Sequence, residues 1–351
     1  MSNLKNILLS SRNSVFRIIE NASLIFFSKI RKLNIYEKHL VIFAPRAGRG
    51  LKVSMDADIW LRALPTDSKW KITVLYFNSR VWILNSIRLL LISRTTKNLK
   101  IILIQYVIEF HKNPSRVLLE YCQTNGANIV KCWMDSYSDA LWNNRILAVS
   151  NIGTLNVISD VPQLDDSKFE KSNRYFFHPV PISIFEYIPF QERKNLIYYS
   201  GGIGTSGLYQ SRKEYLDYLN QHNIPVAGVS YFRDKPSNRL TYDEYRFGLS
   251  NSKIGLNFTW KNEVDVIVTR TWEILSSGVL LLQNKSNVLD GMLVNGTHFL
   301  EFSTKAEMLS LIVEINNNDQ LAKEIALNGL RRYSELYDSG KFWENILNDR
   351  Y

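Results

Sequence analysis

Residues Leu249–Gln283 read LSNSKIGLNFTWKNEVDVIVTRTWEILSSGVLLLQ, and this stretch decides the fold. Its two apolar runs predict buried strands at Lys253–Phe258 and Val279–Gln283. A polar loop, a short helix and a turn at Gly278 join them. The stretch therefore predicts a strand-helix-strand unit.

The predicted helix carries a cation and a carboxylate on one face. Arg270, Glu273 and Ser277 stand at i, i+3 and i+7, so their side chains share that face. The helix follows the carboxyl end of the first strand, where doubly wound folds bind ligands. There a cation and a carboxylate suit a ligand that is charged and carries hydroxyl groups.

Strands and helices alternate over the rest of the chain. In the N-terminal half we expect strands at His39–Pro45, Lys71–Asn78, Ile101–Ile108, Ile129–Met134 and Thr154–Ser159, and helices at Ile59–Leu64, Val81–Ser93 and Ser115–Thr124. In the C-terminal half we expect further strands at Leu196–Ser200, Pro225–Tyr231 and Phe299–Phe302, and helices around Arg212, at Lys305–Asn316 and at Asp319–Tyr337. Near-continuous apolar strands separated by helices predict parallel sheets covered on both faces.

The periodicity weakens between Asp165 and Arg193, where Pro179, Pro181 and Pro189 fall. We therefore expect a linker near residues 165–193. It would separate an N-terminal domain, residues 37–190, from a C-terminal domain, residues 191–351. Residues 1–36 form a separate extension with basic and apolar side chains interleaved, which predicts an amphipathic helix.

Composition narrows the class of protein. The 351 residues, 45% hydrophobic and 22% charged, suit two soluble α/β domains. No apolar run is long enough to span a bilayer and no signal peptide is evident, so a cytoplasmic location is expected. Cys122 and Cys132 match neither a metal-ligand spacing nor a disulfide framework.

Positive charge gathers in the first half. Residues 1–190 carry a net charge of +11 and residues 191–351 a net charge of −1. No compact basic run or nucleic-acid-binding motif is present, so nucleic acid is not an expected partner. An anionic membrane surface, at the inner face of the plasma membrane, or a phosphorylated glycolipid fits this charge. An ordinary basic surface, with the N-terminal helix packed on the first domain, is the alternative.

Several short motifs follow one another between Asn195 and Leu347. They are a strand followed by Gly201-Gly202, then SKIGLNF, RTWEILSSGVLLL, NGTHFLEFST, IALNGLRRY and FWENIL. In this order they resemble the donor-binding half of a GT-B glycosyltransferase, of the group-1-like set that includes spore-maturation-type proteins. The resemblance implies two Rossmann-like, doubly wound domains that face a central cleft. It also implies sugar transfer from a nucleotide-sugar to a glycan or lipid-linked acceptor, in the synthesis of cell-surface polysaccharide or lipopolysaccharide.

The resemblance also implies roles for single residues. Glu273 matches the second glutamate of a Glu-x7-Glu pair that binds ribose hydroxyls, and Asp265 stands in the first position. Arg270 would neutralise the diphosphate, and Gly278 would form the turn after the helix. The alternatives are a carboxylate favoured by the helix dipole for Glu273 and a surface ion pair for Arg270.

Other candidates surround this pair. The Gly201-Gly202 loop between strand and helix suits phosphate binding by backbone amides. Arg212 and Lys253 are further cations for the diphosphate. We expect no metal and no cofactor besides the nucleotide-sugar, because such enzymes commonly use side chains in place of a metal. Asp58 of the Asp-Ala-Asp at 56–58 is expected to cap a helix.

On the acceptor side, Arg46, Gly48 and Arg49 follow the first predicted strand, and His111 and Asp135 follow the third and fourth. These positions face the ligand in a doubly wound sheet. Asp135 or His111 would be the general base of an inverting reaction. Two alternatives to a transferase stay open: an epimerase or hydrolase of sugar-nucleotides with the same fold, and a membrane-associated scaffold without catalysis.

Overall fold

The computed structural model describes residues 22–26, 35–44, 55–65, 69–76, 82–104, 114–133, 152–153, 155–159, 174–182, 187–204, 207–228, 230–232, 240–261 and 265–350. The chain divides into two compact units. The first holds most of the N-terminal half, and the second begins at Phe177 and also takes in Asp58–Leu64 and Ser159–Gln163.

A six-stranded sheet forms the centre of the first unit. The elements of the N-terminal half are, in chain order, β1 (Tyr36–Ala44), α2 (Met55–Arg62), β2 (Lys71–Tyr76), α3 (Trp82–Thr95), β3 (Thr96–Ile104), α4 (Arg116–Thr124), β4 (Asn128–Trp133), β5 (Leu155–Ile158) and β6 (Arg174–Phe177). Most of α2 belongs to the second unit. The strand order is β2-β1-β3-β4-β5-β6, and the pairs from β2 to β5 are parallel. The carboxyl halves of β1 and β3 are fully buried, as their continuous apolar sequence predicts.

Two expectations for the first half need correction. Strand β6 lies inside the predicted linker, so the chain still belongs to the first sheet there. Asp58 lies within α2 and is not its N-cap, because the helix already begins at Met55. Ser115 does cap α4, since its hydroxyl accepts the Leu118 N–H at 3.1 Å.

A five-stranded parallel sheet forms the centre of the second unit. Its strands are β7 (Asn195–Tyr198), β9 (Val226–Ala227), β11 (Ser252–Asn257), β14 (Leu280–Asn284) and β15 (Leu300–Phe302). The helices are α6 (Gly207–Gln221), α7 (Tyr242–Ser250), α8 (Thr269–Ser276), α9 (Lys305–Asn317), α10 (Asp319–Leu336) and α11 (Ser339–Asn348), with 3-10 turns at Phe190–Glu192 and Asn287–Leu289. Two short ladders complete the unit: β8 (Gly201–Ile203) with β10 (Ser230–Phe232), and β12 (Trp260–Lys261) with β13 (Asp265–Val266).

Both sheets share one topology. The second sheet has the order β15-β14-β11-β7-β9, so the first strand of each unit lies between its second and its third. The opening stretch of the sequence forms β11, α8 and β14, as predicted. The predicted strand at Pro225–Tyr231 is divided into β9 and β10, because Gly228 between them has a φ of 102°.

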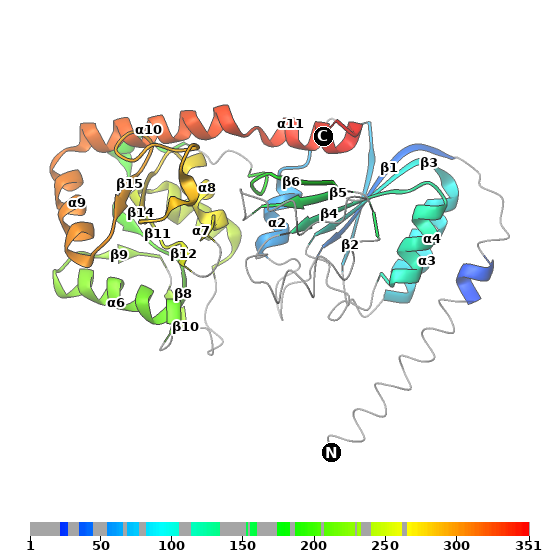
Figure 1. Cartoon of the computed structure of the whole chain (residues 1–351), viewed down its shortest axis with the longest axis horizontal. Coiled ribbons are helices and arrows are strands. Elements are labelled where there is room, and N and C mark those ends of the chain that lie inside the picture. The colour runs from blue at the N-terminus through cyan, green and yellow to red at the C-terminus, as the bar shows by residue number, and fades with distance from the viewer. Residues whose placement is uncertain are drawn as a thin grey trace, which may run out of the picture. The chain divides into compact units, whose positions relative to one another are not determined.

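Helices cover both faces of the second sheet. Helix α6 packs beside α9, and α8 packs beside α10. In Figure 1, α6 lies along the lower side of this sheet and α10 along its upper side. Tyr199, Phe258 and Phe302 join the aliphatic core beneath α6 and α9.

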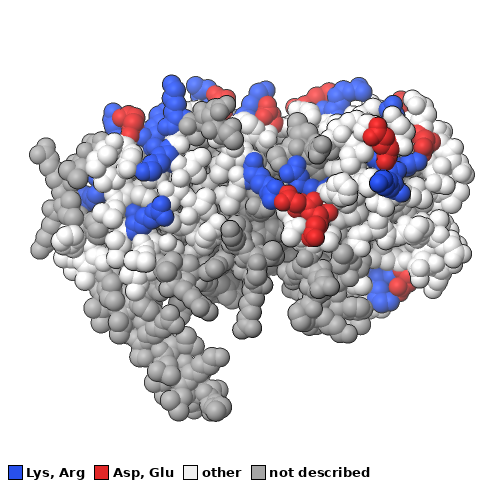
Figure 2. All heavy atoms as spheres, turned by 180° about the vertical axis from the view of Figure 1, so that it is seen from behind, with Lys and Arg blue, Asp and Glu red and all other residues white. Residues whose placement is uncertain are grey.

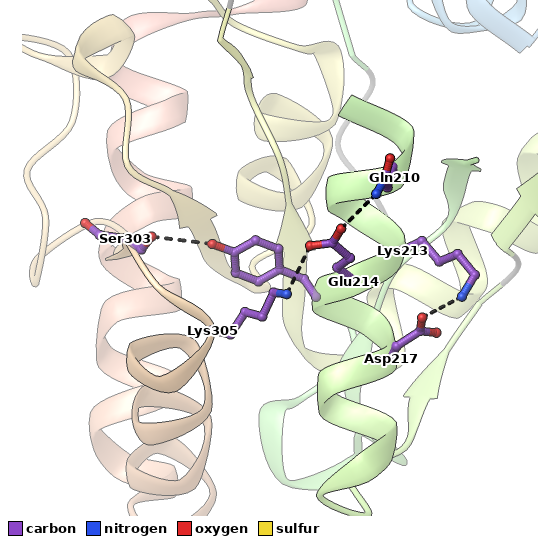
Figure 3. Close-up of polar contacts among 7 residues, drawn as sticks. Gln210, Lys213, Glu214, Asp217, Ser303 and Lys305 are labelled. Carbon is purple, nitrogen blue, oxygen red and sulfur yellow. Dashed lines mark hydrogen bonds and ion pairs between the residues drawn. The ribbon is translucent and has the colours of Figure 1, made fainter. Parts of the chain in front are cut away.

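Polar contacts tie α6 to the start of α9 (Figure 3). Glu214 accepts from Lys305 Nζ at 3.1 Å and from Gln210 at 3.2 Å. The Tyr215 hydroxyl donates to the Ser303 carbonyl at 3.4 Å. These contacts are exposed, so we expect them to orient the helices more than to stabilise the fold.

Helix α2 supplies an aromatic anchor to the second unit. The Trp60 side chain is fully buried, and its ring lies 5.7 Å from Phe342 and 6.2 Å from Trp343 of α11. Arg62 forms a bidentate ion pair with Asp243 at 2.6 and 3.2 Å. A segment of the N-terminal half therefore belongs to the second hydrophobic core, which sequence periodicity alone does not reveal.

The charge asymmetry of the sequence is visible on the surface. On the face shown in Figure 2, Lys and Arg predominate on the first unit, at the left, whereas both signs are interspersed on the second. None of the helices in the described part of the chain combines the length and the apolar character needed to cross a bilayer.

Candidate functional site

The second sheet reverses its direction of winding between β7 and β11. These neighbouring strands send their connections to opposite edges of the sheet, to β9 and to β14. Ligands of doubly wound folds bind outside the carboxyl ends of the strands at such a switch point. Here those ends lead into Gly201 and into the segment before α8. The sequence predicted a loop at Gly201-Gly202, whereas the structure has these residues in the short strand β8, paired with β10.

Arg270 lies next to Gly201, the first residue of β8, at this point. Its guanidinium carbon lies 5.2 Å from the centroid of the Tyr199 ring. A Cβ atom at Gly201 would lie 2.8 Å from Arg270 Nη2 and 2.9 Å from the Tyr199 hydroxyl. A side chain at position 201 would therefore displace the guanidinium or the ring. The structure brings together two predicted donor-binding positions that are distant in the sequence, Gly201 of β8 and Arg270 in the first turn of α8.

Glu273 lies one helical turn further along α8 and is 5% exposed. Its Oε2 accepts a hydrogen bond from the buried Tyr245 hydroxyl at 2.9 Å. Burial raises the pKa of Tyr245 well above 10, and the charge of Glu273 raises it further. Burial also raises the pKa of Tyr198, which Arg270 lowers and Glu273 raises, to about 12. Arg270, Glu273 and the two tyrosines therefore form one electrostatic cluster.

Arg212 approaches the same edge from α6. The side chain is 9% exposed, and its Nη2 donates to the Phe258 carbonyl, one residue after β11, at 3.4 Å. The guanidinium also lies 5.5 Å from the centre of the Tyr209 ring. Arg212 thus adds positive charge near the end of β11.

A buried polar network beneath the first turn of α8 was not anticipated from the sequence. Asn257 Nδ2 donates to Thr271 Oγ1 at 3.0 Å and to Gln283 Oε1 at 2.9 Å, and Thr271 Oγ1 donates to Gln283 Oε1 at 3.1 Å. Asn257 and Gln283 end the apolar strands β11 and β14. The sequence feature that could have predicted this network is an amide side chain near the end of each of two neighbouring buried strands. The network fixes the residue next to Arg270.

Gly278 performs the role expected of it. Its φ is 63°, in the left-handed region, and its N–H donates to the Leu275 carbonyl at 3.0 Å. Ser277 is the C-cap of α8, and its buried hydroxyl donates to the Ile274 carbonyl at 2.7 Å. Gly202 is buried in β8, where its carbonyl accepts from the Tyr199 hydroxyl at 3.3 Å.

The structure separates Lys253 from this cluster. Lys253 stands at the amino end of β11, and its Nζ forms an ion pair with Asp319 of α10 at 2.6 Å. The carboxyl ends of the parallel strands lie at the opposite edge, so this geometry does not support diphosphate binding by Lys253. For Asp265 the structure describes only the backbone, which pairs with Lys261 in the β12–β13 ladder.

The remaining predicted residues lie outside the described residues. They are the proposed bases His111 and Asp135 and the acceptor loop residues Arg46, Gly48 and Arg49. The strands before the loop and before His111, β1 and β3, are neighbours at the switch point of the first sheet. Among the described side chains, no three His, Cys, Asp or Glu residues gather closely enough to hold a metal ion. Cys122 and Cys132 are buried thiols whose pKa burial raises.

Comparison with known proteins agrees with this architecture. Residues 212–348 match the family model described as glycosyl transferase-like. The structure is similar to that of Anabaena Alr3699/HepE in complex with UDP and glucose, with a TM-score of 0.57 and 10% identity over 89% of this chain and 99% of that chain. It is also similar to sucrose-phosphate synthase from Thermosynechococcus elongatus, with a TM-score of 0.50 and 9% identity over 89% of this chain and 97% of that chain. No curated protein matches the sequence.

These likenesses, at such low identity, concern the fold. Two doubly wound units with the same strand order are the architecture that the sequence motifs predicted. The chain therefore has the two-domain GT-B fold, and part of its second unit matches the glycosyl transferase-like model.

Proposed function

We propose that the chain is a glycosyltransferase whose second unit binds a nucleotide-sugar at the carboxyl ends of β7 and β11. The observation that carries the proposal is the meeting of Arg270, Gly201 and Glu273 at that edge, from segments far apart in the sequence. The complexes of HepE with UDP and glucose and with UDP-glucose support a nucleotide-sugar donor.

Each group has a defined part in this proposal. The Arg270 guanidinium binds the diphosphate through two N–H groups, and the absence of a side chain at Gly201, at the start of β8, leaves room for that guanidinium. Glu273 accepts hydrogen bonds from the ribose hydroxyls. When the glycosidic bond breaks, negative charge grows on the leaving diphosphate, and Arg270 and Arg212 stabilise it. A metal ion is not part of the proposed mechanism.

The acceptor side remains a matter of proposal. The loop after β1, with Arg46, Gly48 and Arg49, would bind an anionic glycan or glycolipid, and Asp135 or His111 would supply the general base of an inverting reaction. The net charge of +11 over residues 1–190 supports an anionic acceptor. A place in the synthesis of cell-surface polysaccharide or lipopolysaccharide follows from such an acceptor.

We also propose that the chain works in the cytoplasm and contacts the inner face of the plasma membrane through its first residues. In the helical segment 22–26, Ile25 and Phe26 are 59% and 62% exposed. Exposed apolar side chains among cations suit an anionic bilayer. We expect the full chain to float with anionic liposomes and a chain that starts at Tyr36 to stay behind. Equal flotation of the two would refute membrane contact.

The donor proposal is tested by thermal denaturation with UDP, GDP, ADP, CDP and TDP. We expect one of them to raise the midpoint for the wild type, and Glu273→Ala to abolish the rise, because binding to the folded state stabilises it. Lys213→Ala is a matched control, since Lys213 pairs with Asp217 on the exposed side of α6. No response to any nucleotide would favour a scaffold without catalysis. In a separate assay with a nucleotide-sugar, release of the nucleotide in the absence of an acceptor would favour a hydrolase.

A further inference from the structure

The contact between Tyr245 and Glu273 joins two helices inside the second unit. Tyr245 belongs to α7 and Glu273 to α8, and both side chains are buried. The Tyr245 hydroxyl donates to Glu273 Oε2 at 2.9 Å. A buried hydrogen bond to a carboxylate is stronger than one between neutral groups, so it restricts the orientation of the carboxylate.

The position of the Tyr245 hydroxyl is itself well defined. Helix α7 begins with a capping box, in which Thr241 and Glu244 exchange hydrogen bonds. Further along the helix, Gly248 packs against the Tyr198 ring so closely that a Cβ atom there would lie 2.5 Å from it. The Tyr245 ring packs against the rings of Tyr198 and Tyr242, whose centroids lie 5.9 and 6.2 Å away. The donor therefore has little freedom to move.

The Tyr245 hydroxyl also stays protonated, so it can always donate its hydrogen bond to Glu273. Because burial and the nearby Glu273 charge hold its pKa well above 10, the hydroxyl keeps its proton at any pH at which the protein would be assayed. Tyr245 thus differs from a solvent molecule or a mobile side chain, which could leave the carboxylate when a ligand enters.

We propose that Tyr245 is a positioning residue that orients Glu273 toward the ribose hydroxyls of the bound nucleotide. This inference rests on the proposed function and adds to it the residue that sets the geometry of ribose recognition. Tyr245 does not itself contact the nucleotide in this account. Its effect is therefore expected on the discrimination of ribose hydroxyls, more than on the affinity for the diphosphate.

The test compares UDP, GDP, ADP and CDP with their 2′-deoxy and 3′-deoxy forms by isothermal titration calorimetry. The wild type is expected to prefer the ribose form by about tenfold, the equivalent of one hydrogen bond to a charged group. Tyr245→Phe, which removes one oxygen atom, is expected to lose most of this preference, as is Glu273→Gln. Tyr242→Phe removes a hydroxyl from the same helix and is expected to keep it.

The outcomes distinguish a failure of the positioning role of Tyr245 from a failure of the proposed nucleotide binding. If the wild type binds a nucleotide with ribose preference and Tyr245→Phe keeps that preference, the positioning role is refuted and the donor site stands. If Tyr245→Phe weakens the ribose and deoxyribose forms equally, Tyr245 has only a structural role, which also refutes the proposal. If the wild type binds none of the nucleotides, the proposed function fails and the positioning role fails with it.

Discussion

Gly201 is a residue of the candidate site at which a small change would act directly on Arg270. A methyl group there would meet Arg270 Nη2 at 2.8 Å and the Tyr199 hydroxyl at 2.9 Å. The guanidinium can move because it ends a flexible side chain, so the fold should tolerate the change. We expect Gly201→Ala to weaken nucleoside diphosphate binding by about tenfold, the loss of roughly one charge-assisted hydrogen bond.

Calorimetric titration would measure the nucleotide affinity, and urea denaturation would measure whether the fold tolerates the change. Gly340→Ala is a suitable control, because Gly340 lies in α11 and a Cβ there would meet only the Asp338 carboxylate at 3.2 Å. Unchanged nucleotide affinity in Gly201→Ala would mean that Arg270 does not bind the ligand from its present position.

Single residues were predictable where a local pattern defined their role. Helical spacing placed Arg270 and Glu273 on one face of a predicted helix, and Gly201 was singled out by its place between a strand and a helix. The structure brings Arg270 next to Gly201, and their roles in binding stay predictions. Tyr199 and Tyr245 were not found, because their contacts depend on where β7 and α7 lie in space. The prediction that Lys253 binds the diphosphate lacks support for a similar reason. Lys253 lies near the start of β11, and the opposite end of that strand faces the candidate site.

At the scale of elements, the buried network of Asn257, Thr271 and Gln283 joins α8 to the ends of the neighbouring strands β11 and β14. Thr271→Val keeps the shape of the side chain and removes a donor and an acceptor from this network. Because the remaining amides are buried, we expect a loss of about 1–3 kcal/mol in the free energy of unfolding.

Urea denaturation of the wild type and the variant measures this difference. Thr124→Val serves as a control, since the Thr124 hydroxyl donates to a helix carbonyl at an exposed position. A loss no larger than that of the control would show that the network does not determine the stability of α8.

Elements were predicted best where apolar runs were continuous. The strands β1, β2, β4, β11 and β14 and the helices α3, α4, α8, α9 and α10 are found within a few residues of their expected positions. Strand β6 was missed because prolines follow it closely, and they dominated the local pattern. The break between β9 and β10 depends on Gly228, where a Cβ would lie 2.2 Å from the Tyr199 carbonyl oxygen.

At the scale of the molecule, stability should depend on pH through His178. This side chain packs against Phe342 and Tyr337 at the start of the second unit, with ring centroids 4.5 and 5.5 Å away. Burial lowers its pKa from 6.5 to about 4. The unfolded chain therefore binds the proton at a higher pH than the folded chain. The stabilisation is complete above about pH 6.5 and is lost as the pH falls toward 4.

From pH 7.5 to pH 5 the expected loss from His178 is about 2 kcal/mol. Urea melts at the two pH values, on the wild type and on His178→Asn, would measure it. Burial lowers the pKa of His39 in the first unit to about 4 as well, so some pH dependence should persist in the variant. An identical pH dependence in both proteins would contradict the role of His178.

The division into units was only partly predictable from the sequence. The alternation of strands and helices predicted two sheets, and both are present. The sequence did not predict that Asp58–Leu64 belongs to the second unit. This membership depends on the packing of Trp60 against Phe342 and Trp343, which are distant in the sequence. Periodicity reports which face of a helix is apolar and does not report what covers that face.

The central claim is that Arg270 and Glu273 bind a nucleoside diphosphate at the carboxyl ends of β7 and β11. Isothermal titration of the wild type, Arg270→Ala and Glu273→Ala with UDP, GDP, ADP, CDP and TDP tests it most directly. One nucleotide is expected to bind the wild type, and each variant is expected to bind it at least about tenfold more weakly, since each loses a contact with a charged group. Equal affinity in the wild type and both variants, or no binding of any nucleotide to the wild type, would contradict it.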